Sequence, residues 1–149
     1  MDWELAYRVA NAAATLAWLP LLVAPRSRFT RAFTSAPLAP LALACVYVAL
    51  TAVMFAGDGD GGMESLAQLR VGFASDPVLL LAWVHYLSFD LLVGFWEVRD
   101  SARQQLSPWA VAPCLLLTFL LGPAGLALYL ALRLARRGSL RFDLAPPAA

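Results

Sequence analysis

The chain has 149 residues, of which 61% are hydrophobic and only 14% are charged. A soluble domain of this length needs far more polar surface to cover its core, so this composition excludes an ordinary soluble enzyme and favours an integral membrane protein. The 11 basic and 10 acidic residues nearly balance, so no nucleic-acid partner is expected.

Apolar segments of about 20 residues, the length that spans about 30 Å of hydrocarbon, recur four times. Three of them begin at or just after proline, whose missing N–H is harmless in the first turn of a helix. We therefore predict an all-α, four-helix transmembrane bundle that forms one domain over residues 1–144. The four predicted spans cover residues 3–24, 37–56, 77–96 and 109–132.

The segments that precede, join and follow these spans differ in character. Asp2 and Glu4 precede the first span, which is unlike the positive start of a signal peptide, so we expect that span to be retained. The second connection opens with a Gly- and Asp-rich turn at 57–62, and residues 63–73 follow it as a short amphipathic segment on the membrane surface. The Pro-rich residues 145–149 are expected to be a disordered tail.

The distribution of basic residues, all of which are arginines, hardly determines the orientation in the membrane. With four crossings, the first and third connections share one side and carry five of them, while the other side carries six. The positive-inside rule then gives almost a tie, and we expect a cytoplasmic tail. The second group contains Arg8, Arg70, Arg133, Arg136, Arg137 and Arg141.

The third span carries the ionisable residues that are costly at membrane depth. On a helical wheel, His85 and Asp90 share one arc with Trp83, Tyr86, Glu97 and Asp100, and we expect this polar arc to face the bundle. We expect the opposite, apolar side to face lipid. That side contains Leu80, Val84, Leu87, Leu91, Phe95 and Val98.

Depth separates these groups into two sets. At about 1.5 Å per residue, Asp90 lies close to the midplane and His85 about 7.5 Å from it along the axis. The two could flank a ligand without bonding to each other, and we predict that they are functional because an unused buried carboxyl costs stability. Glu97 and Asp100 lie near the interface, where charges that pair with nearby arginines are as good an explanation as function.

Other residues at the level of His85 are candidate ligand contacts. Asn11 of the first span enters from the same side, and Trp83 and Tyr86 could line a flat apolar slot, although such aromatics are more often packing. In the fourth span, Pro123 removes the hydrogen bond to residue 119, and Gly122 and Gly125 allow close approach of backbone or ligand. A kink that serves only packing is the alternative.

Several chemistries find no support in the residues. A single histidine, with no second one four residues away, does not indicate a catalytic metal site, and no phosphate-binding loop, dinucleotide fingerprint or nucleophile elbow is visible. We therefore predict no metal and no cofactor. A small transporter remains open, but it would have to assemble as a homo-oligomer.

The pattern Trp83-x-His85-x-x-x-x-Asp90-Leu91, continuing to Asp100 and followed by Gly122-Pro123-x-Gly125, resembles the abscisic-acid-deficient-four family of neoxanthin synthase-like membrane proteins. The four-span layout extends the resemblance over most of the chain. Plant members are implicated in converting violaxanthin to neoxanthin in plastid membranes. The short, Arg-rich chain without a transit peptide looks bacterial, so we expect a protein of the bacterial inner membrane.

This resemblance implies binding or isomerisation of a carotenoid or another apolar isoprenoid lipid. Opening an epoxide to an allene needs one proton delivered to oxygen and one removed from carbon, without a redox cofactor, and His85 and Asp90 could act as acid and base. Their assignment to the two roles is open. The rival hypothesis is a non-enzymatic scaffold or assembly subunit in which Asn11, His85 and Asp90 only join helices.

Overall fold

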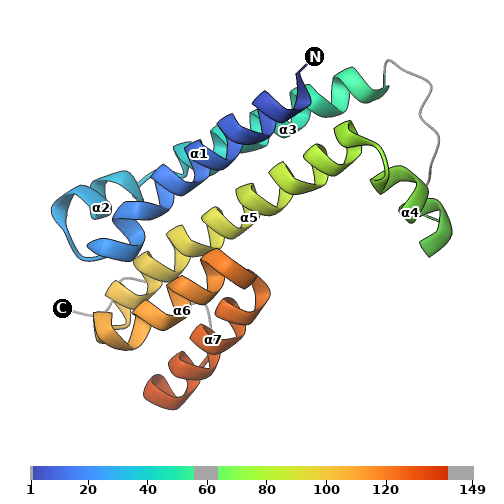
Figure 1. The fold of residues 1–149 in the computed structure, drawn as a ribbon. Coiled ribbons are helices and arrows are strands. Elements are labelled where there is room, and N and C mark those ends of the chain that lie inside the picture. The colour runs from blue at the N-terminus through green and yellow to red at the C-terminus, as the bar shows by residue number, and fades with distance from the viewer. Residues whose placement is uncertain (1, 56–63, 141–149) are drawn as a thin grey trace. The chain divides into compact units, whose positions relative to one another are not determined.

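The computed structural model describes residues 2–55 and 64–140 (Figure 1). In these residues the chain forms helices and no strand, which confirms the all-α prediction. The predicted turn at 57–62, Met63 and the tail at 145–149 lie outside the described residues. The helices are α1 (Trp3–Val23), α2 (Arg28–Phe33), α3 (Leu38–Phe55), α4 (Leu66–Phe73), α5 (Asp76–Arg103), α6 (Pro108–Leu121) and α7 (Pro123–Arg137).

The chain forms two compact units, and two helices contribute residues to both. Unit 1 comprises Met1–Thr15 and Leu38–Phe89, and unit 2 comprises Leu16–Pro37 and Asp90–Ala149. The buried apolar side chains of unit 1 include Ala10, Ala14, Leu43, Leu50, Leu80 and Val84. Those of unit 2 include Trp18, Leu21, Leu91, Val111 and Leu115.

Two of the described helices are long and apolar enough to cross a membrane. They are α1, with 21 residues, and α5, with 28 residues. Leu38–Met54 and Pro108–Leu121 form shorter apolar helices. The all-α part of the predicted four-helix bundle therefore holds, whereas within residues 2–55 and 64–140 only α1 and α5 are both long and apolar enough to qualify as full crossings.

The predicted fourth span is divided into two helices. Gly122 has φ 48° and ψ −96°, which ends α6, and Pro123 starts α7 in the position where its missing N–H is harmless. α6 and α7 then pack along each other as a hairpin (Figure 1). A Cβ on Gly125 would overlap the Thr118 backbone nitrogen, so only glycine allows this close approach. The sequence analysis correctly predicted a break in the helix at this position. It did not predict that the chain reverses direction there.

The apolar side of α5 that was expected to face lipid is instead buried. Leu80, Val84, Leu87, Leu91, Phe95 and Val98 are each at most 9% exposed. Asp90, Glu97 and Asp100 on the opposite side are also buried, whereas His85 and Trp83 are exposed. The prediction of a lipid-facing apolar side was therefore wrong, because a helical wheel separates polar from apolar positions but does not say how many neighbours a helix has.

The short α4 falls inside the predicted amphipathic segment. The Ser65 hydroxyl accepts from the Gln68 backbone N–H at 3.2 Å, which caps the first turn, and none of its residues is buried. An exposed helix with Leu66, Val71 and Phe73 on its surface is compatible with a position on the membrane surface.

Candidate functional site

The α5 side that faces the α6–α7 hairpin, together with the residue directly after α5, carries four polar residues at helical spacing. Asp90, Glu97, Asp100 and Gln104 are separated by 7, 3 and 4 residues, which places them along one stripe. Each of them meets a residue of the hairpin. We refer to these four residues and their partners Gly122, Thr118, Tyr129, Arg133 and Arg137 as the polar ladder.

Glu97 is held by α6 in a fully buried position. The Thr118 hydroxyl lies 2.9 Å from Oε1 and 3.1 Å from Oε2 of Glu97, and it donates its single proton to this carboxylate. Both residues are 0% exposed. A carboxyl in such surroundings has to be hydrogen-bonded, paired or protonated. The hydrogen bond from Thr118 therefore offsets part of the desolvation cost of burying Glu97.

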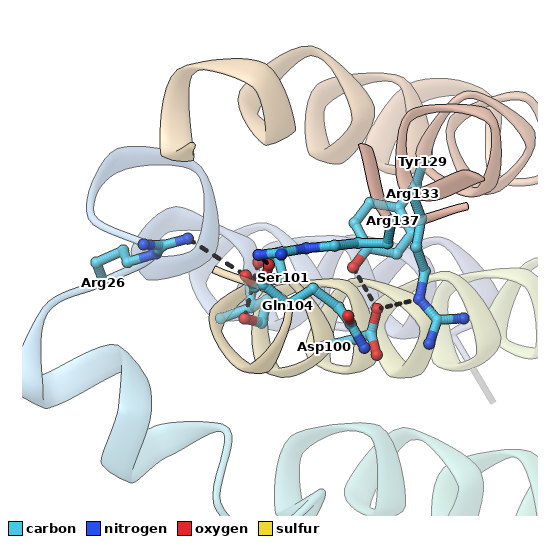
Figure 2. A network of polar contacts seen from close by, with 8 residues as sticks. Arg26, Asp100, Ser101, Gln104, Tyr129, Arg133 and Arg137 are labelled. Atoms are coloured by element: carbon cyan, nitrogen blue, oxygen red, sulfur yellow. Dashed lines mark hydrogen bonds and ion pairs between the residues drawn. The ribbon is translucent and has the colours of Figure 1, made fainter. Parts of the chain in front are cut away.

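Asp100 is held by α7 through two groups (Figure 2). The Tyr129 hydroxyl donates to Oδ2 of Asp100 at 2.6 Å, and Nε of Arg133 lies 3.1 Å from the same oxygen. Tyr129 and Arg133 are one helical turn apart, so both reach the same carboxylate. The Trp96 ring packs edge-on against the Tyr129 ring at 5.2 Å. Asp100 and Arg133 therefore form a buried ion pair.

Two more arginines bind carbonyl groups in the last turn of α5 and in the connection that follows it (Figure 2). Arg26 donates to the Ser101 and Leu106 carbonyls, and Arg137 donates to the Gln104 carbonyl. The last carbonyls of a helix have no intrahelical partner and form the negative end of its dipole, so a guanidinium is favourable there.

Asp90 and Gly122 meet at the tip of the hairpin. A Cβ on Gly122 would lie 2.5 Å from Oδ1 and 2.9 Å from Oδ2 of Asp90, so the glycine leaves room for this carboxyl group. Asp90 is 9% exposed. The structure thus brings together two residues that the sequence analysis selected on separate helices. Pro123 beside them is exposed, and Gly125 packs on Thr118.

An aromatic groove lies in unit 1, at the start of α1 and α5. The Trp83 indole N–H donates to Oδ1 of Asn11 at 2.8 Å, and the Trp83 ring stacks on Tyr86 at 5.3 Å. The groove has a volume of about 430 Å³, within the usual range of small-molecule sites. Its lining residues are Trp3, Glu4, Tyr7, Asp76, Leu79, Leu80 and Trp83.

His85 contacts a different set of rings. Its imidazole lies 5.5 Å from the Tyr47 ring of α3 and 4.7 Å from the Phe89 ring, both measured between ring centroids. The side chain is exposed, in contrast to the enclosed position expected from the sequence. The predicted site residues thus fall into three sets: Asn11, Trp83 and Tyr86; His85; and Asp90 with Gly122.

Sequence reasoning missed the partners of Glu97 and Asp100. It placed these two carboxylates near the interface and counted Arg133 among arginines outside the membrane, whereas Glu97 is 0%, Asp100 8% and Arg133 1% exposed. Asp100 does pair with an arginine, as expected, but the partner is Arg133, while Arg99 donates to the Thr34 and Ser35 carbonyls. The available signal was Tyr129 and Arg133 four residues apart on one helix, matching the stripe on α5.

Comparison with known proteins gives one positive result. The family model described as ABA DEFICIENT 4-like matches residues 5–129. No curated protein and no solved structure matches the chain. The matched segment runs from the first turn of α1 into the first half of α7. It includes the groove residues from Tyr7 to Trp83 and the polar ladder except Arg133 and Arg137. Together with the two long apolar helices, it indicates a membrane protein, and the chain belongs to the ABA DEFICIENT 4-like family.

Proposed function

We propose that this protein binds an apolar isoprenoid lipid, such as a carotenoid, within the membrane and isomerises it. The observation that carries the proposal is the aromatic groove, because it combines flat aromatic surfaces with two carboxylates in a volume of about 430 Å³. This volume suits one end ring of a carotenoid with part of its polyene chain. The family membership supports the same ligand class.

The groove offers both apolar and polar contacts to such a ring. Trp3, Tyr7 and Trp83 provide aromatic surface, and the hydrogen bond from Trp83 to Asn11 fixes the indole plane. Glu4 and Asp76 provide acceptors for a ring hydroxyl. Glu4 already holds Arg8 at 2.8 Å in an exposed ion pair, so Asp76 is the better acceptor of the two.

His85 and Asp90, which are not among the residues that line the groove, are proposed as acid and base on the basis of the family resemblance. Isomerisation of an epoxide to an allene breaks one C–O bond after protonation of oxygen, and it removes one proton from carbon, so its atoms and electrons balance without an oxidant. Asp90 is buried beside Gly122, which leaves room for the carboxyl group. His85, between two aromatic rings, carries the second titratable group.

The test uses the purified full-length chain in lipid nanodiscs with an epoxy-carotenoid, and it follows product by chromatography and mass. An isomer of unchanged mass is expected. Asp90→Asn and His85→Gln should each lower kcat by about 10²–10⁴-fold, the usual contribution of a general acid or base. Trp83→Leu should chiefly raise KM, because it removes ring contacts and not a proton donor.

Two controls separate loss of chemistry from loss of folding. Glu64→Gln removes an exposed carboxylate, and Trp109→Leu removes an indole that is 88% exposed, so both should leave turnover unchanged. If Asp90→Asn and His85→Gln convert substrate at the wild-type rate, the proposed roles are wrong. Each variant must also keep the wild-type Tm.

The alternative of a non-enzymatic scaffold is favoured by one observation, the buried pairing of α5 with the hairpin through Glu97–Thr118 and Asp100–Arg133. A scaffold would bind carotenoid weakly or not at all. Substitutions of Asp90 would then lower Tm or release a partner protein without any change in pigment. Pigment and lipid profiles of a deletion strain distinguish the two functions in the cell.

A further inference from the structure

The α6–α7 hairpin is too short for either helix to cross a bilayer. α6 has 14 residues and α7 has 15, which correspond to about 21 Å and about 22 Å at the usual rise per residue. The hydrocarbon core is about 30 Å thick. A topology in which residues 109–132 form a complete crossing therefore does not fit these helices.

Both ends of the hairpin lie beside the end of α5. The hairpin begins at Pro108, directly after a tight connection in which the Leu106 N–H donates to the Ser101 carbonyl at 2.9 Å. It returns at Arg137, which donates to the Gln104 carbonyl, after Arg133 has paired with Asp100 (Figure 2). The chain thus enters and leaves the hairpin at the same end of α5.

The tip of the hairpin reaches far along α5. Gly122 at the tip adjoins Asp90, which precedes the last residue of α5, Arg103, by 13 positions. This separation corresponds to about 20 Å along the helix axis, roughly two thirds of the hydrocarbon thickness. The Asp100 and Glu97 contacts lie between these levels, so the hairpin follows α5 throughout.

Exposed charge at this end of α5 is entirely positive in the part of unit 2 that the structure describes. Its three acidic residues, Asp90, Glu97 and Asp100, are all buried. Arg26, Arg99 and Arg137 donate hydrogen bonds to backbone carbonyls near the ends of α5 and α2. The exposed arginines of this unit are Arg26, Arg28, Arg31, Arg99, Arg103, Arg136 and Arg137, which we call the arginine surface.

We propose that α6–α7 is a re-entrant hairpin and that the arginine surface around its two ends lies against the anionic headgroups of the cytoplasmic leaflet. α1 and α5 then cross the membrane together with α3, whose 18 residues lie at the lower end of the usual range for a crossing. The end of α7 stays on the side where α5 ends. This arrangement resolves the near tie in the arginine count, because seven exposed arginines lie on one side and only Arg8 and Arg70 belong to the described exposed residues of unit 1. It does not depend on the proposed function.

Cysteine labelling of the full-length chain tests the topology. In a background with Cys45→Ala and Cys114→Ala, single cysteines are placed by Gln105→Cys before α6, Gly138→Cys after α7 and Ala124→Cys at the tip. A membrane-impermeant maleimide is applied to right-side-out and inverted vesicles. The first two variants should react only in inverted vesicles, and Ala124→Cys should react only after detergent is added.

Each other labelling result overturns the proposal. Labelling of Gln105→Cys and Gly138→Cys from opposite sides would show a full crossing, and labelling of both only in right-side-out vesicles would reverse the orientation. Reaction of Ala124→Cys in intact vesicles would place the hairpin in water. Glu64→Cys, before α4, is the control that should react from the opposite side, and Arg136→Cys replaces Gly138→Cys if that variant does not fold.

The lipid partner is tested in nanodiscs of phosphatidylglycerol or phosphatidylcholine. The Tm should be higher in the anionic lipid, and a variant with Arg28→Gln, Arg31→Gln and Arg136→Gln should lose most of that difference. Arg70→Gln, an exposed arginine of α4, is the matched control and should keep it. An equal Tm of the wild-type protein in both lipids would contradict the assignment of an anionic partner.

Discussion

The three carboxylates that the structure describes in unit 2 are buried in three different ways. Glu97 receives one hydroxyl proton from Thr118, Asp100 receives a phenol proton and a guanidinium, and Asp90 lies against a glycine. Desolvation of a carboxylate costs several kcal/mol unless partners replace its water. The number and type of partners therefore decide how each residue responds to substitution.

Removing one partner of the Asp100–Arg133 pair should lower the free energy of unfolding more than replacing both partners with apolar residues. Arg133→Met leaves a buried carboxylate and should lower the free energy of unfolding by about 3–5 kcal/mol, whereas Asp100→Leu combined with Arg133→Met should cost less than Arg133→Met alone. Unfolding in detergent mixtures measures both. Arg136→Met, an exposed arginine on the same helix, should change stability by less than about 0.5 kcal/mol. Additive effects of the two substitutions would show that the pair is not coupled.

Gly122 is constrained both by its backbone and by Asp90. Gly122→Ala should destabilise the protein by about 1–2 kcal/mol for the positive φ and by about 1–3 kcal/mol more for contact with the carboxyl group. Gly138→Ala is the matched control, since its φ is +67° but nothing lies within 4 Å of the added Cβ. Gly122, with ψ −96°, lies outside the left-handed region that Gly138 occupies, so the two variants should differ by the contact with Asp90 and by this extra backbone strain. Equal thermal shifts would mean that Asp90 moves aside freely.

At the scale of elements, the hairpin depends on the close approach of α7 to α6. Gly125 packs directly on the backbone of Thr118, whose hydroxyl holds Glu97. One small residue thus controls both the packing of the hairpin and the position of a polar partner. Closely packed helices in membranes commonly use small residues in this way.

Gly125→Leu should separate α6 from α7 and lower the free energy of unfolding by about 1–3 kcal/mol or more, because the added side chain overlaps backbone atoms that cannot yield. Ala127→Leu, on an exposed position of the same helix, should be tolerated. Tm in detergent measures the difference. A Gly125→Leu protein as stable as the Ala127→Leu protein would contradict the close packing at this position.

At the scale of the whole molecule, exposed charge is divided between the two units. The described residues of unit 1 expose Asp2, Glu4, Glu64 and Asp76 beside two arginines, whereas those of unit 2 expose arginines without a carboxylate. Interactions between such exposed charges and headgroups are screened by salt, in contrast to the buried pairs of the polar ladder.

The gain in Tm from anionic lipid should therefore shrink between about 0.1 M and about 1 M salt, as the screening length falls from about 10 Å to about 3 Å. The loss of stability in Arg133→Met should persist at both concentrations, because that pair is buried. Thermal unfolding of both proteins in phosphatidylglycerol nanodiscs measures the two effects. A salt-independent gain would mean that the preference for this lipid is not electrostatic.

The sequence by itself determined the helical fold class, the long apolar helices, the membrane family and the break at Gly122. These properties follow from composition, from periodicity and from the backbone preferences of Gly and Pro, which are local. It also grouped Asp90, Glu97 and Asp100 on one side of α5, since residue spacing on a helix is set by its geometry alone.

Only the tertiary structure decided what those side chains meet. The reversal at Gly122 brought Thr118, Tyr129 and Arg133 to the carboxylates of α5, and it returned the end of α7 to the end of α5. It also buried the side of α5 that had been expected to face lipid. Such outcomes depend on the direction in which the chain turns and on which helices pack together, and neither is encoded in the periodicity of a single helix.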